Sequence, residues 1–460
     1  MQQFDLIVIG AGSGLDVAAG AADAGLKIAI IEDGPLGGTC LNRGCIPSKI
    51  IIKSAEVADI IHRALEFGLK ASLAKIDLKK VTTRASSLVD ADAKSIEQGV
   101  TATKNQTLFK GKGKFVAPYI LEVNGEQITA PKIVIATGAR PTIPQILGLD
   151  KVSFLTSTEA LRLTKLPESM IIIGGGYIGA ELGYFYAALG TKVTILQRNK
   201  LLIPREDVEV AKVFSELWKE KGNAYFNTEI INVVQNKNIC KVTFRSNNQT
   251  KTIAAEKLLI ATGVTPNSDT LDLEKAGIQI TDHAFIKVNK FMETSAKNIW
   301  ALGDIAGNYM FKHSANQEAE YILETILRKK KSLLPPKAID YFPMPHAIFT
   351  NPQIAGVGLT EQQAQEQKRN YVIGRYEYQM TGMGAALKEK NGFVKFIVDK
   401  KTKEILGCHI LGPEASTLIH EVCVAMKADR KKALENIRNT IHVHPALSEV
   451  VQRAAWKVPL

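Results

Sequence analysis

Residues 4–14 read FDLIVIGAGSG, a short apolar run that leads into three glycines at alternate positions. An alanine-rich stretch follows from Leu15 to Ala24, and a second apolar run, residues 27–31, ends at Glu32. This order predicts a strand–helix–strand unit that binds a dinucleotide, because glycines let the backbone approach a pyrophosphate at a helix N-terminus and the acid binds a ribose. Leu15 occupies the usual place of the third glycine, so the flanking strands and Glu32 support the prediction more than the glycines do.

The same unit recurs later in the chain. Residues 170–181 read MIIIGGGYIGAE, with the complete glycine pattern, and a further strand is expected at residues 192–196. The segments IVIATG at 133–138 and LLIATG at 258–263 each follow a glycine unit at a broadly similar distance. These repeats predict an internal duplication of the dinucleotide-binding domain.

A chain of 460 residues with 45% hydrophobic side chains is too long for one core. We expect an α/β fold with two Rossmann-like dinucleotide-binding domains and a separate C-terminal α+β domain. The expected boundaries are 1–144, 145–270, a return to the first domain over 271–340, and a C-terminal domain over 341–460, with a linker at LLPP, residues 333–336. We see neither a secretory signal nor an apolar stretch that spans a bilayer, so we expect a cytoplasmic protein without a membrane partner.

The net charge of +12 raises nucleic acid as a partner. The densest basic runs, residues 328–331 and 430–432, follow helix-like stretches and contain no aromatic residues on which bases could stack. We interpret them as solvated helix ends, where cations also suit the helix dipole. No nucleic-acid partner is expected.

Two of the five cysteines form a pattern of their own. Cys240, Cys408 and Cys423 stand alone in apolar contexts and are expected in the core, whereas Cys40 and Cys45 lie in GGTCLNRGCIPSK, residues 37–49. A metal site would need a second ligand pair at suitable spacing, and none is present. A redox pair fits better, because thiol–disulfide exchange needs one attacking thiolate and one resolving thiol.

The stretch from 37 to 49 closely resembles the redox-active disulfide motif of the flavin-dependent pyridine nucleotide–disulfide oxidoreductases. Later motifs follow in the family's order over essentially the whole chain. The resemblance implies that the first unit binds FAD through Gly10, Gly12, Gly14, Glu32, Lys49, Thr137, Gly138, Asp304 and Ala315. It implies that the second unit binds NAD or NADP through Gly174, Gly176, Gly179, Gln197, Arg198 and Gly263.

Residues 440–449, TIHVHPALSE, resemble the catalytic His–Glu signature of the same family. The resemblance implies that His444 is the base and that Glu449 orients it, since a carboxylate on one ring nitrogen raises the basicity of the other. It further implies a Lys49–Glu181 ion pair beside the flavin. It also implies a homodimer in which the C-terminal α+β domain is the dimerisation domain and His444 reaches the partner's disulfide site.

The implied mechanism has two half-reactions. A dithiol substrate is oxidised by the Cys40–Cys45 disulfide through a mixed disulfide on Cys40, while His444 takes the proton. Cys45 faces the flavin and passes two electrons to FAD, and a hydride then goes to the nicotinamide ring. Each step is reversible, so both directions stay open.

Two substrates remain open within the family. The paired His442 and His444, the cysteine segment and His313 resemble the members that oxidise dihydrolipoamide with NAD⁺, which would add a lipoyl-bearing acyltransferase component as a partner.

The alternative is an NADPH-dependent disulfide reductase of the mycothione, glutathione or mercuric reductase type. Gln197-Arg198 stand where family members that use NAD usually have a glutamate. Without that acid, and with an arginine beside it, the site could accommodate the 2′-phosphate of NADP. Arg198, Lys200 and Arg205 are the candidate contacts, although Arg198 fits equally well as a solvated loop residue. The glycine stretch 10–14, with Leu15 after it, also resembles mycothione reductases.

Overall fold

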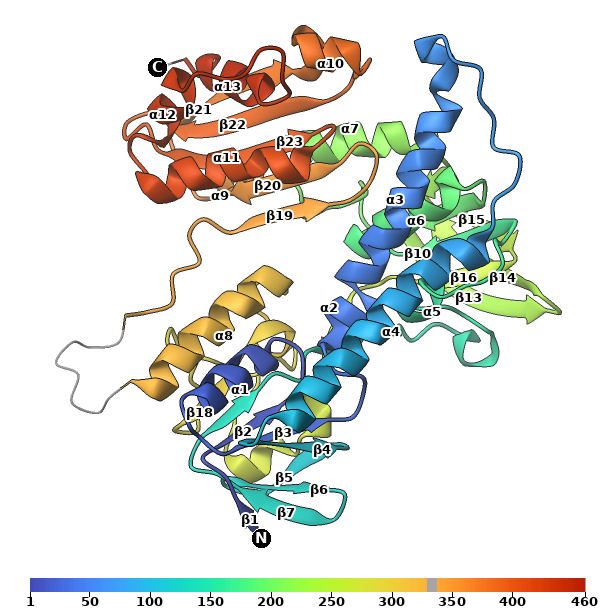
Figure 1. Ribbon diagram of the computed structural model, residues 1–460. Coiled ribbons are helices and arrows are strands. Elements are labelled where there is room, and N and C mark those ends of the chain that lie inside the picture. Colours follow the sequence, from blue (N-terminus) through green and yellow to red (C-terminus); the bar gives the residue numbers. More distant parts are fainter. Residues whose placement is uncertain (329–336, 460) are drawn as a thin grey trace. The chain divides into compact units, whose positions relative to one another are not determined.

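The computed structural model of the chain describes residues 1–328 and 337–459 (Figure 1). The chain divides into two compact units, each of which is discontinuous in sequence. Unit 1 comprises Met1–Ile50, Lys80–Thr142 and Gly263–Tyr341, and unit 2 comprises Ile51–Lys79, Ile143–Thr262 and Phe342–Leu460. Most of the basic run 328–331, and the expected linker 333–336, lie outside the described residues. The four-part division expected from the sequence stays a prediction.

A five-stranded parallel sheet forms the centre of unit 1, in the order β18-β8-β2-β3-β4. Its strands are β2 (Leu6–Ile9), β3 (Ile28–Glu32), β4 (Gln106–Lys110), β8 (Ile133–Ile135) and β18 (Ile299–Ala301). Helix α1 (Gly14–Asp23) joins β2 to β3, so the predicted strand–helix–strand unit is present.

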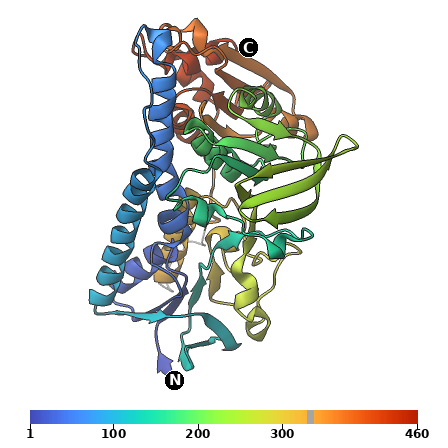
Figure 2. The same cartoon turned by 90° about the vertical axis from the view of Figure 1, so that its right-hand side faces the viewer.

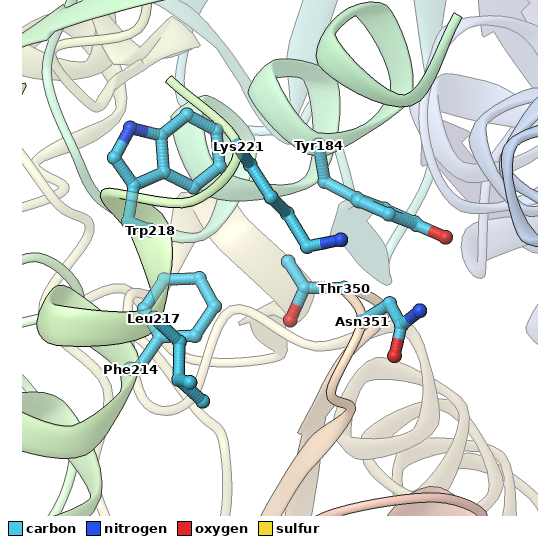
Figure 3. A pocket seen from close by; sticks show the side chains of 7 residues that line it. All are labelled: Tyr184, Phe214, Leu217, Trp218, Lys221, Thr350 and Asn351. Atoms are coloured by element: carbon cyan, nitrogen blue, oxygen red, sulfur yellow. The ribbon is translucent and has the colours of Figure 1, made fainter. Parts of the chain in front are cut away.

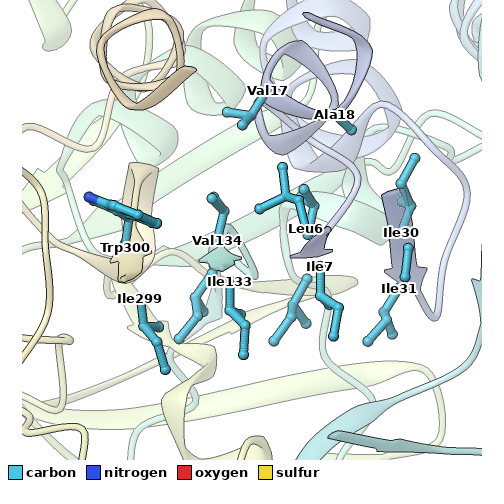
Figure 4. Packing of buried hydrophobic residues seen from close by; sticks show 14 of the residues in the cluster. Leu6, Ile7, Val17, Ala18, Ile30, Ile31, Ile133, Val134, Ile299 and Trp300 are labelled. Carbon is cyan, nitrogen blue, oxygen red and sulfur yellow. The ribbon is translucent and has the colours of Figure 1, made fainter. Parts of the chain in front are cut away.

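The core of unit 1 explains why the central strands β2, β8 and β18 are apolar along their whole length. Side chains of neighbouring residues point to opposite faces of the sheet, and both faces are covered (Figure 4). Val17 and Ala18 of α1 lie over the face that carries Leu6 and Val134.

Smaller elements complete unit 1. The remaining strands are β1 (Gln2–Gln3), β5 (Gly113–Ala117), β6 (Ile120–Val123) and β7 (Glu126–Thr129), which form one sheet, and β9 (Ala139–Pro141) and β17 (Val264–Pro266), which pair antiparallel. The other helices are α2 (Gly38–Arg43) and α8 (Lys312–Leu327). Two further helices, α3 (Cys45–His62) and α4 (Leu78–Ala102), have residues in both units.

Unit 2 contains a second parallel sheet, in the order β12-β11-β10-β16, with a glycine turn between β10 and its helix. The strands are β10 (Ser169–Ile173), β11 (Lys192–Leu196), β12 (Asn223–Tyr225) and β16 (Lys257–Ile260), and the helices are α5 (Ser157–Ala160), α6 (Tyr177–Ala188) and α7 (Val208–Trp218). An antiparallel ribbon, drawn in yellow-green in Figure 2, consists of β13 (Thr228–Asn236), β14 (Ile239–Ser246) and β15 (Gln249–Ala255).

The C-terminal part of unit 2 is an antiparallel sheet covered by helices, as expected of an α+β domain. Its order is β19-β20-β23-β22-β21, and its strands are β19 (Pro345–Ile348), β20 (Ile354–Gly358), β21 (Tyr371–Glu377), β22 (Phe393–Asp399) and β23 (Ile405–Leu411). Its helices are α9 (Glu361–Glu366), α10 (Gly382–Ala386), α11 (Ala415–Ala428), α12 (Ala433–Asn439) and α13 (Glu449–Trp456). Helix α11 packs on β19, β20 and β23, and α13 packs on β21 and β22.

These elements confirm the expected fold class. Cys240, Cys408 and Cys423 are buried, as predicted. None of the helices in the described part of the chain is long and apolar enough to cross a membrane.

Candidate functional site

The first glycine turn brings polar backbone groups to one edge of the unit 1 sheet. Gly10 has φ +101°, and a Cβ there would overlap the carbonyl oxygen of Ala136, so no side chain is tolerated. Glu32 holds the turn: its carboxylate accepts hydrogen bonds from the Ala11 N–H at 2.7 Å and the Gly34 N–H at 2.8 Å. These bonds fix the conformation of the turn that leads into α1, and the N-terminus of a helix is where an anion binds.

Two further polar side chains follow adjacent strands of the same sheet. Thr137 comes after β8 and Asp304 after β18, and the Leu302 N–H donates to the Ile135 carbonyl at 3.0 Å, which joins the two strand ends. Carboxyl ends of neighbouring parallel strands meet at one edge, where ligands of α/β sheets bind.

These two side chains lack partners within the described residues. The hydroxyl oxygen of Thr137 is buried without a hydrogen bond, and burial raises the pKa of the Asp304 carboxyl group. Ala315 lies at the start of α8, with its Cβ 3.4 Å from the position that a Cβ of Gly303 would take. Unpartnered polar groups beside an open helix N-terminus fit a ligand that carries hydroxyl and phosphate groups, as FAD does.

The two cysteines of the redox motif lie on either side of a helix break. Cys40 is half-buried in α2, Cys45 is exposed at the first position of α3, and both are in thiol form. Gly44 makes the break, because a Cβ there would lie 2.8 Å from the Thr39 carbonyl oxygen. The Asn42 amide fixes the preceding loop by donating to the carbonyls of Pro35, Leu36 and Gly38.

The two thiols interact directly. A hydrogen bond with Cys45, burial and the charge of Cys45 together raise the pKa of the Cys40 thiol, whereas the charge of Lys312 acts to lower it. The structure thus brings Cys40 and Cys45 together as a dithiol, which is what thiol–disulfide exchange needs.

The second glycine turn repeats the geometry of the first. Gly174 has φ +108°, and a Cβ there would overlap the carbonyl oxygen of Ala261, just as Gly10 approaches Ala136. Gln197 takes the place of Glu32: its side-chain oxygen accepts from the Gly175 N–H at 3.1 Å, and its amide donates to the Leu201 carbonyl at 3.1 Å. The position that carries the acid Glu32 at the first glycine turn thus carries the neutral amide Gln197 at the second.

The remaining residues expected at the second turn are small or exposed. A Cβ on Gly179 would overlap the Gly174 carbonyl oxygen, whereas Gly176 has open space around it. Gly263 has φ +115° and belongs to the next segment of unit 1. Arg198, Lys200 and Arg205 are exposed, and none pairs with a carboxylate among the described residues.

A buried acid beside the second turn was not anticipated from the sequence. Glu206 accepts a hydrogen bond from the hydroxyl of Tyr177, the first residue of α6, and its other oxygen lies 2.9 Å from Nε2 of His346. Burial acts to raise the pKa of Glu206, but the hydrogen bond and charge of His346 hold it below its usual value. In the sequence, Glu206 is marked only as an acidic residue two positions before α7.

The C-terminal histidines occupy different surroundings. His444 is exposed, and its Nδ1 lies 3.0 Å from Glu449, whose other oxygen accepts from the Ala446 N–H at 3.2 Å. The hydrogen bond with His444 holds the pKa of Glu449 below its usual value. His442 is half-buried, and its side chain contacts Glu421 and the Thr440 carbonyl. His444 and Glu449 thus form the expected pair.

Lys49 and Glu181 belong to different units. Lys49 lies on α3 within unit 1, and Glu181 is buried on α6 of unit 2, where it accepts from the Phe349 N–H at 2.9 Å. Their expected ion pair stays a prediction. His313 is exposed and stacks on Phe311, with ring centroids 5.2 Å apart.

A hollow between α6, α7 and the segment after β19 is a packing defect and not a binding site. It is lined by Tyr184, Phe214, Leu217, Trp218, Lys221, Thr350 and Asn351, and it has no room for a water molecule (Figure 3). Lys221 spans it, with its ammonium 5.2 Å from the centre of the Tyr184 ring. No dithiol or glycine turn lines this hollow.

The chain is similar to known disulfide oxidoreductases over its whole length. The family described as pyridine nucleotide-disulphide oxidoreductase matches residues 4–319, and the dimerisation domain of that family matches residues 344–455. A dihydrolipoyl dehydrogenase of Geobacillus stearothermophilus is 36% identical, covering 98% of this chain and 95% of that protein. A mycothione reductase of Mycobacterium tuberculosis is 34% identical, covering 99% of each. The structure of the flavoprotein disulfide reductase RclA from Escherichia coli superposes with a TM-score of 0.87 at 28% identity, covering 99% of each chain.

Proposed function

The chain belongs to the pyridine nucleotide-disulphide oxidoreductase family, and on this premise we propose that it oxidises dihydrolipoamide to lipoamide with NAD⁺ as the acceptor. Members of this family are oxidoreductases that use FAD and NAD(P), and the dimerisation domain supports a homodimer. The observation that carries the proposal is the interacting thiol pair Cys40 and Cys45 at the start of α3.

FAD fits the edge of the unit 1 sheet. The proposed contacts are Gly10, Gly12, Gly14, Glu32, Lys49, Thr137, Gly138, Asp304 and Ala315. Support comes from the unpartnered Thr137 hydroxyl and the unpaired Asp304 carboxyl group, which suit hydroxyl and phosphate oxygens. When bound, FAD supplies two-electron transfer between the dithiol and the nicotinamide nucleotide.

The cysteines perform the exchange chemistry in this proposal. With Cys40 and Cys45 joined as a disulfide, one substrate thiolate attacks the Cys40 sulfur, a mixed disulfide forms, and Cys45 leaves as a thiolate. The second substrate thiolate then displaces Cys40, which closes the lipoamide disulfide and leaves both cysteines reduced. Per turnover the substrate loses two electrons and two protons, the nicotinamide nucleotide gains two electrons and one proton as a hydride, and the other proton is released to solvent.

His444 is the proposed base for the two substrate protons. Its Nδ1 is engaged by Glu449, which fixes the tautomer that presents Nε2 as the acceptor. In the homodimer this histidine would serve the dithiol of the partner subunit, so each active site would draw on both chains. A lipoyl-bearing acyltransferase would then be the protein partner that presents the substrate.

A second function is favoured by Gln197. A carboxylate at this position selects NAD by binding the ribose 2′-hydroxyl, and an amide removes the charge that would repel a 2′-phosphate. The exposed Arg198, Lys200 and Arg205 follow within one loop. The alternative is therefore an NADPH-dependent reductase of another disulfide, of which mycothione is one candidate.

Steady-state reduction of NAD⁺ and NADP⁺ by dihydrolipoamide, measured on the purified holoenzyme, tests the two functions. Rapid turnover that disappears in the Cys45→Ser variant supports dihydrolipoamide oxidation. The nucleotide that is reduced faster, NAD⁺ or NADP⁺, is then the cofactor of the enzyme. If dihydrolipoamide reduces neither nucleotide while NADPH bleaches the flavin absorbance, the first function is wrong and a panel of disulfides comes next. If NADPH also leaves the flavin oxidised, the second function is wrong as well.

A further inference from the structure

The loop between β11 and α7, residues 197–207, is fastened to the second glycine turn. The Gly175 N–H donates to the Gln197 side chain at 3.1 Å, and the Gly175 carbonyl accepts from the Ile203 N–H at 2.7 Å. A Cβ on Gly175 would lie 2.5 Å from a methyl carbon of Leu202, so a glycine is needed for so close an approach. The loop and the turn are therefore built as one piece.

Ile203 holds a strained conformation within this loop. It is fully buried and has φ +45°, a left-handed conformation that a β-branched residue rarely adopts. Such strain persists only where the surroundings fix the backbone. Besides the bond from its N–H to Gly175, its carbonyl accepts from the Glu206 N–H at 3.0 Å. The neighbours of the loop thus impose a single conformation on it.

Glu206 stands at the end of the loop and joins three segments of unit 2. Its side chain is fully buried, and one carboxylate oxygen accepts from the hydroxyl of Tyr177, the first residue of α6. The other carboxylate oxygen lies 2.9 Å from Nε2 of His346 on β19. The rings of Tyr177 and His346 also stack, with centroids 6.2 Å apart. One carboxylate therefore connects the loop to the helix after the glycine turn and to the C-terminal sheet.

The C-terminal part of unit 2 is shaped to receive this end of the loop. Gly356 is the register partner of His346 in β20, and a Cβ there would come within 2.7 Å of the His346 ring, so glycine makes room for the ring. Gln362 of α9 holds the backbone: its amide donates to the Glu206 carbonyl at 2.8 Å, and its oxygen accepts from the Val208 N–H at 3.2 Å. Two elements of the C-terminal part thus bind the end of the loop.

We propose that Glu206 is a positioning residue of the nicotinamide-nucleotide site, which fixes the loop at residues 197–207 against the second glycine turn. The loop carries the exposed cations Arg198, Lys200 and Arg205. A loop that is already ordered loses less conformational entropy when a ligand binds, so fixing the loop raises the affinity for the nucleotide. The inference rests on the proposed role of the second glycine turn as the nucleotide site, and it holds for NAD and for NADP.

Anaerobic reduction of the flavin by NADPH and by NADH, followed by stopped-flow absorbance on the holoenzyme, tests the proposal without a dithiol substrate. The dependence on nucleotide concentration separates the half-saturating concentration from the limiting rate constant. We expect Glu206→Leu to raise the half-saturating concentration of the preferred nucleotide by about tenfold. The limiting rate constant should stay within about twofold, because Glu206 acts on binding and not on the hydride step.

Three variants make the result specific. Glu206→Gln keeps the shape of the side chain and can still bond to both of its partners, so it should stay within about twofold of the parent. Gln362→Leu keeps Glu206 but releases the backbone at the end of the loop, so it should raise the half-saturating concentration by about threefold or more. Gln353→Leu is the matched control, because Gln353 bonds to Ser416 in the same part of the chain and should change nothing.

The proposal is wrong if Glu206→Leu and Gln362→Leu, each with flavin bound, keep the parental half-saturating concentrations for both nucleotides. If Glu206→Leu cannot be obtained with flavin, an unchanged value in Gln362→Leu decides against the proposal. It is also wrong if Gln353→Leu raises the values as far as Glu206→Leu, because the effect would then follow a general loosening of the C-terminal part.

The proposed function fails by a different result. If the parent enzyme does not turn over dihydrolipoamide while both variants still weaken nucleotide binding, only the substrate is refuted and the role of Glu206 stands. If neither nucleotide reduces the flavin of the parent enzyme, the proposed nucleotide site is wrong, and the role of Glu206 is refuted with it.

Discussion

His442 and His444 stand two residues apart, yet only one of them is available to take a proton. Both ring nitrogens of His442 are engaged, Nδ1 by the Thr440 carbonyl and Nε2 by Glu421, and its side chain is 6% exposed. The side chain of His444 is 75% exposed, and its Nδ1 contacts Glu449, whereas its Nε2 makes no hydrogen bond to the described residues. A base must reach its substrate, so exposure separates the two histidines where the sequence motif does not.

We expect His444→Gln and His442→Gln to have opposite signatures. Loss of a general base costs about 10²- to 10⁴-fold in kcat for dihydrolipoamide oxidation, so His444→Gln should be nearly inactive with an unchanged melting temperature. His442→Gln removes a buried partner of Glu421 and should lower the melting temperature while kcat stays within a few-fold. Steady-state kinetics and thermal melting of the two holoenzymes check this. Equal losses of kcat in both variants would contradict the assignment of His444.

Gln197 offers a second test at the residue scale. A glutamate at position 197 would keep a side-chain oxygen that accepts from the Gly175 N–H, but it would lose the amide that donates to the Leu201 carbonyl. It would also add a negative charge beside the proposed nucleotide site. We expect Gln197→Glu to move the ratio of kcat/KM for NADPH over NADH toward NADH by about tenfold or more, because a carboxylate repels a 2′-phosphate and binds a 2′-hydroxyl.

The variant Arg198→Ala provides a second test of the preference for NADPH over NADH. If Arg198 contacts the 2′-phosphate, this change should raise KM for NADPH and leave KM for NADH unaltered. If it is a solvated loop residue, both KM values should stay the same. An unchanged nucleotide ratio in Gln197→Glu would show that Gln197 has no part in the selection.

At the scale of elements, strand β22 shows how alternation builds two different faces. Val394 and Phe396 enter the apolar core beneath α11 and α13, whereas Lys395 between them points to the other face. There Lys395 is almost fully buried and pairs with Asp207 at 2.9 Å and with Glu361 at 2.6 Å. The cluster ties the sheet of the C-terminal part to the loop that begins α7.

We expect Lys395→Met to lower the free energy of unfolding by about 3–5 kcal/mol, because it leaves the buried Asp207 carboxylate without its cation. Lys114→Met is the control, since Lys114 and Glu122 form an exposed pair 3.6 Å apart that contributes about 0–1 kcal/mol. Denaturant unfolding of both holoenzymes measures the difference. Equal effects would mean that the Lys395 cluster adds nothing beyond a surface ion pair.

The same cluster gives a pH dependence with a definite sign. Burial acts to raise the pKa of Asp207, but His409, the Glu361 N–H and Lys395 lower it overall. A carboxyl group whose folded pKa is lowered stabilises the fold above its unfolded pKa and loses that contribution as the pH falls through the folded pKa. The protein should therefore lose stability on acidification below about pH 4, with a shallower loss in Lys395→Met.

The elements differ in how far the sequence predicts them. Both glycine turns follow apolar runs whose period and length are local properties, so their strands and helices were predicted to within a few residues. The partners of Lys395 in strand β22 were not predicted, because Asp207 and Glu361 lie far away in sequence. The hydrogen bond from Lys312 to the Ser13 hydroxyl was not predicted for the same reason, since the two residues are 299 positions apart.

For the whole molecule, the segment around the proposed base indicates association. Ile441 and Val443 are 97% and 75% exposed in the part of the chain that matches the dimerisation domain. Large apolar side chains held in solvent directly before the proposed base, His444, are expected at an interface. In a symmetric dimer such a surface meets its own copy, which would cover these side chains and bring His444 to the other chain.

Hybrid dimers test the shared active site most directly. Cys45→Ser subunits lack the dithiol and His444→Gln subunits lack the base, so each homodimer should be inactive. After dissociation and random reassociation of an equal mixture, half of the dimers would be hybrids, each with one intact site composed of Cys45 from one subunit and His444 from the other. Activity should therefore recover to about a quarter of the parental value if the site spans a two-fold interface. If each subunit carries a complete site of its own, no hybrid contains an intact one and the mixture should stay inactive, so a single turnover assay separates the two arrangements.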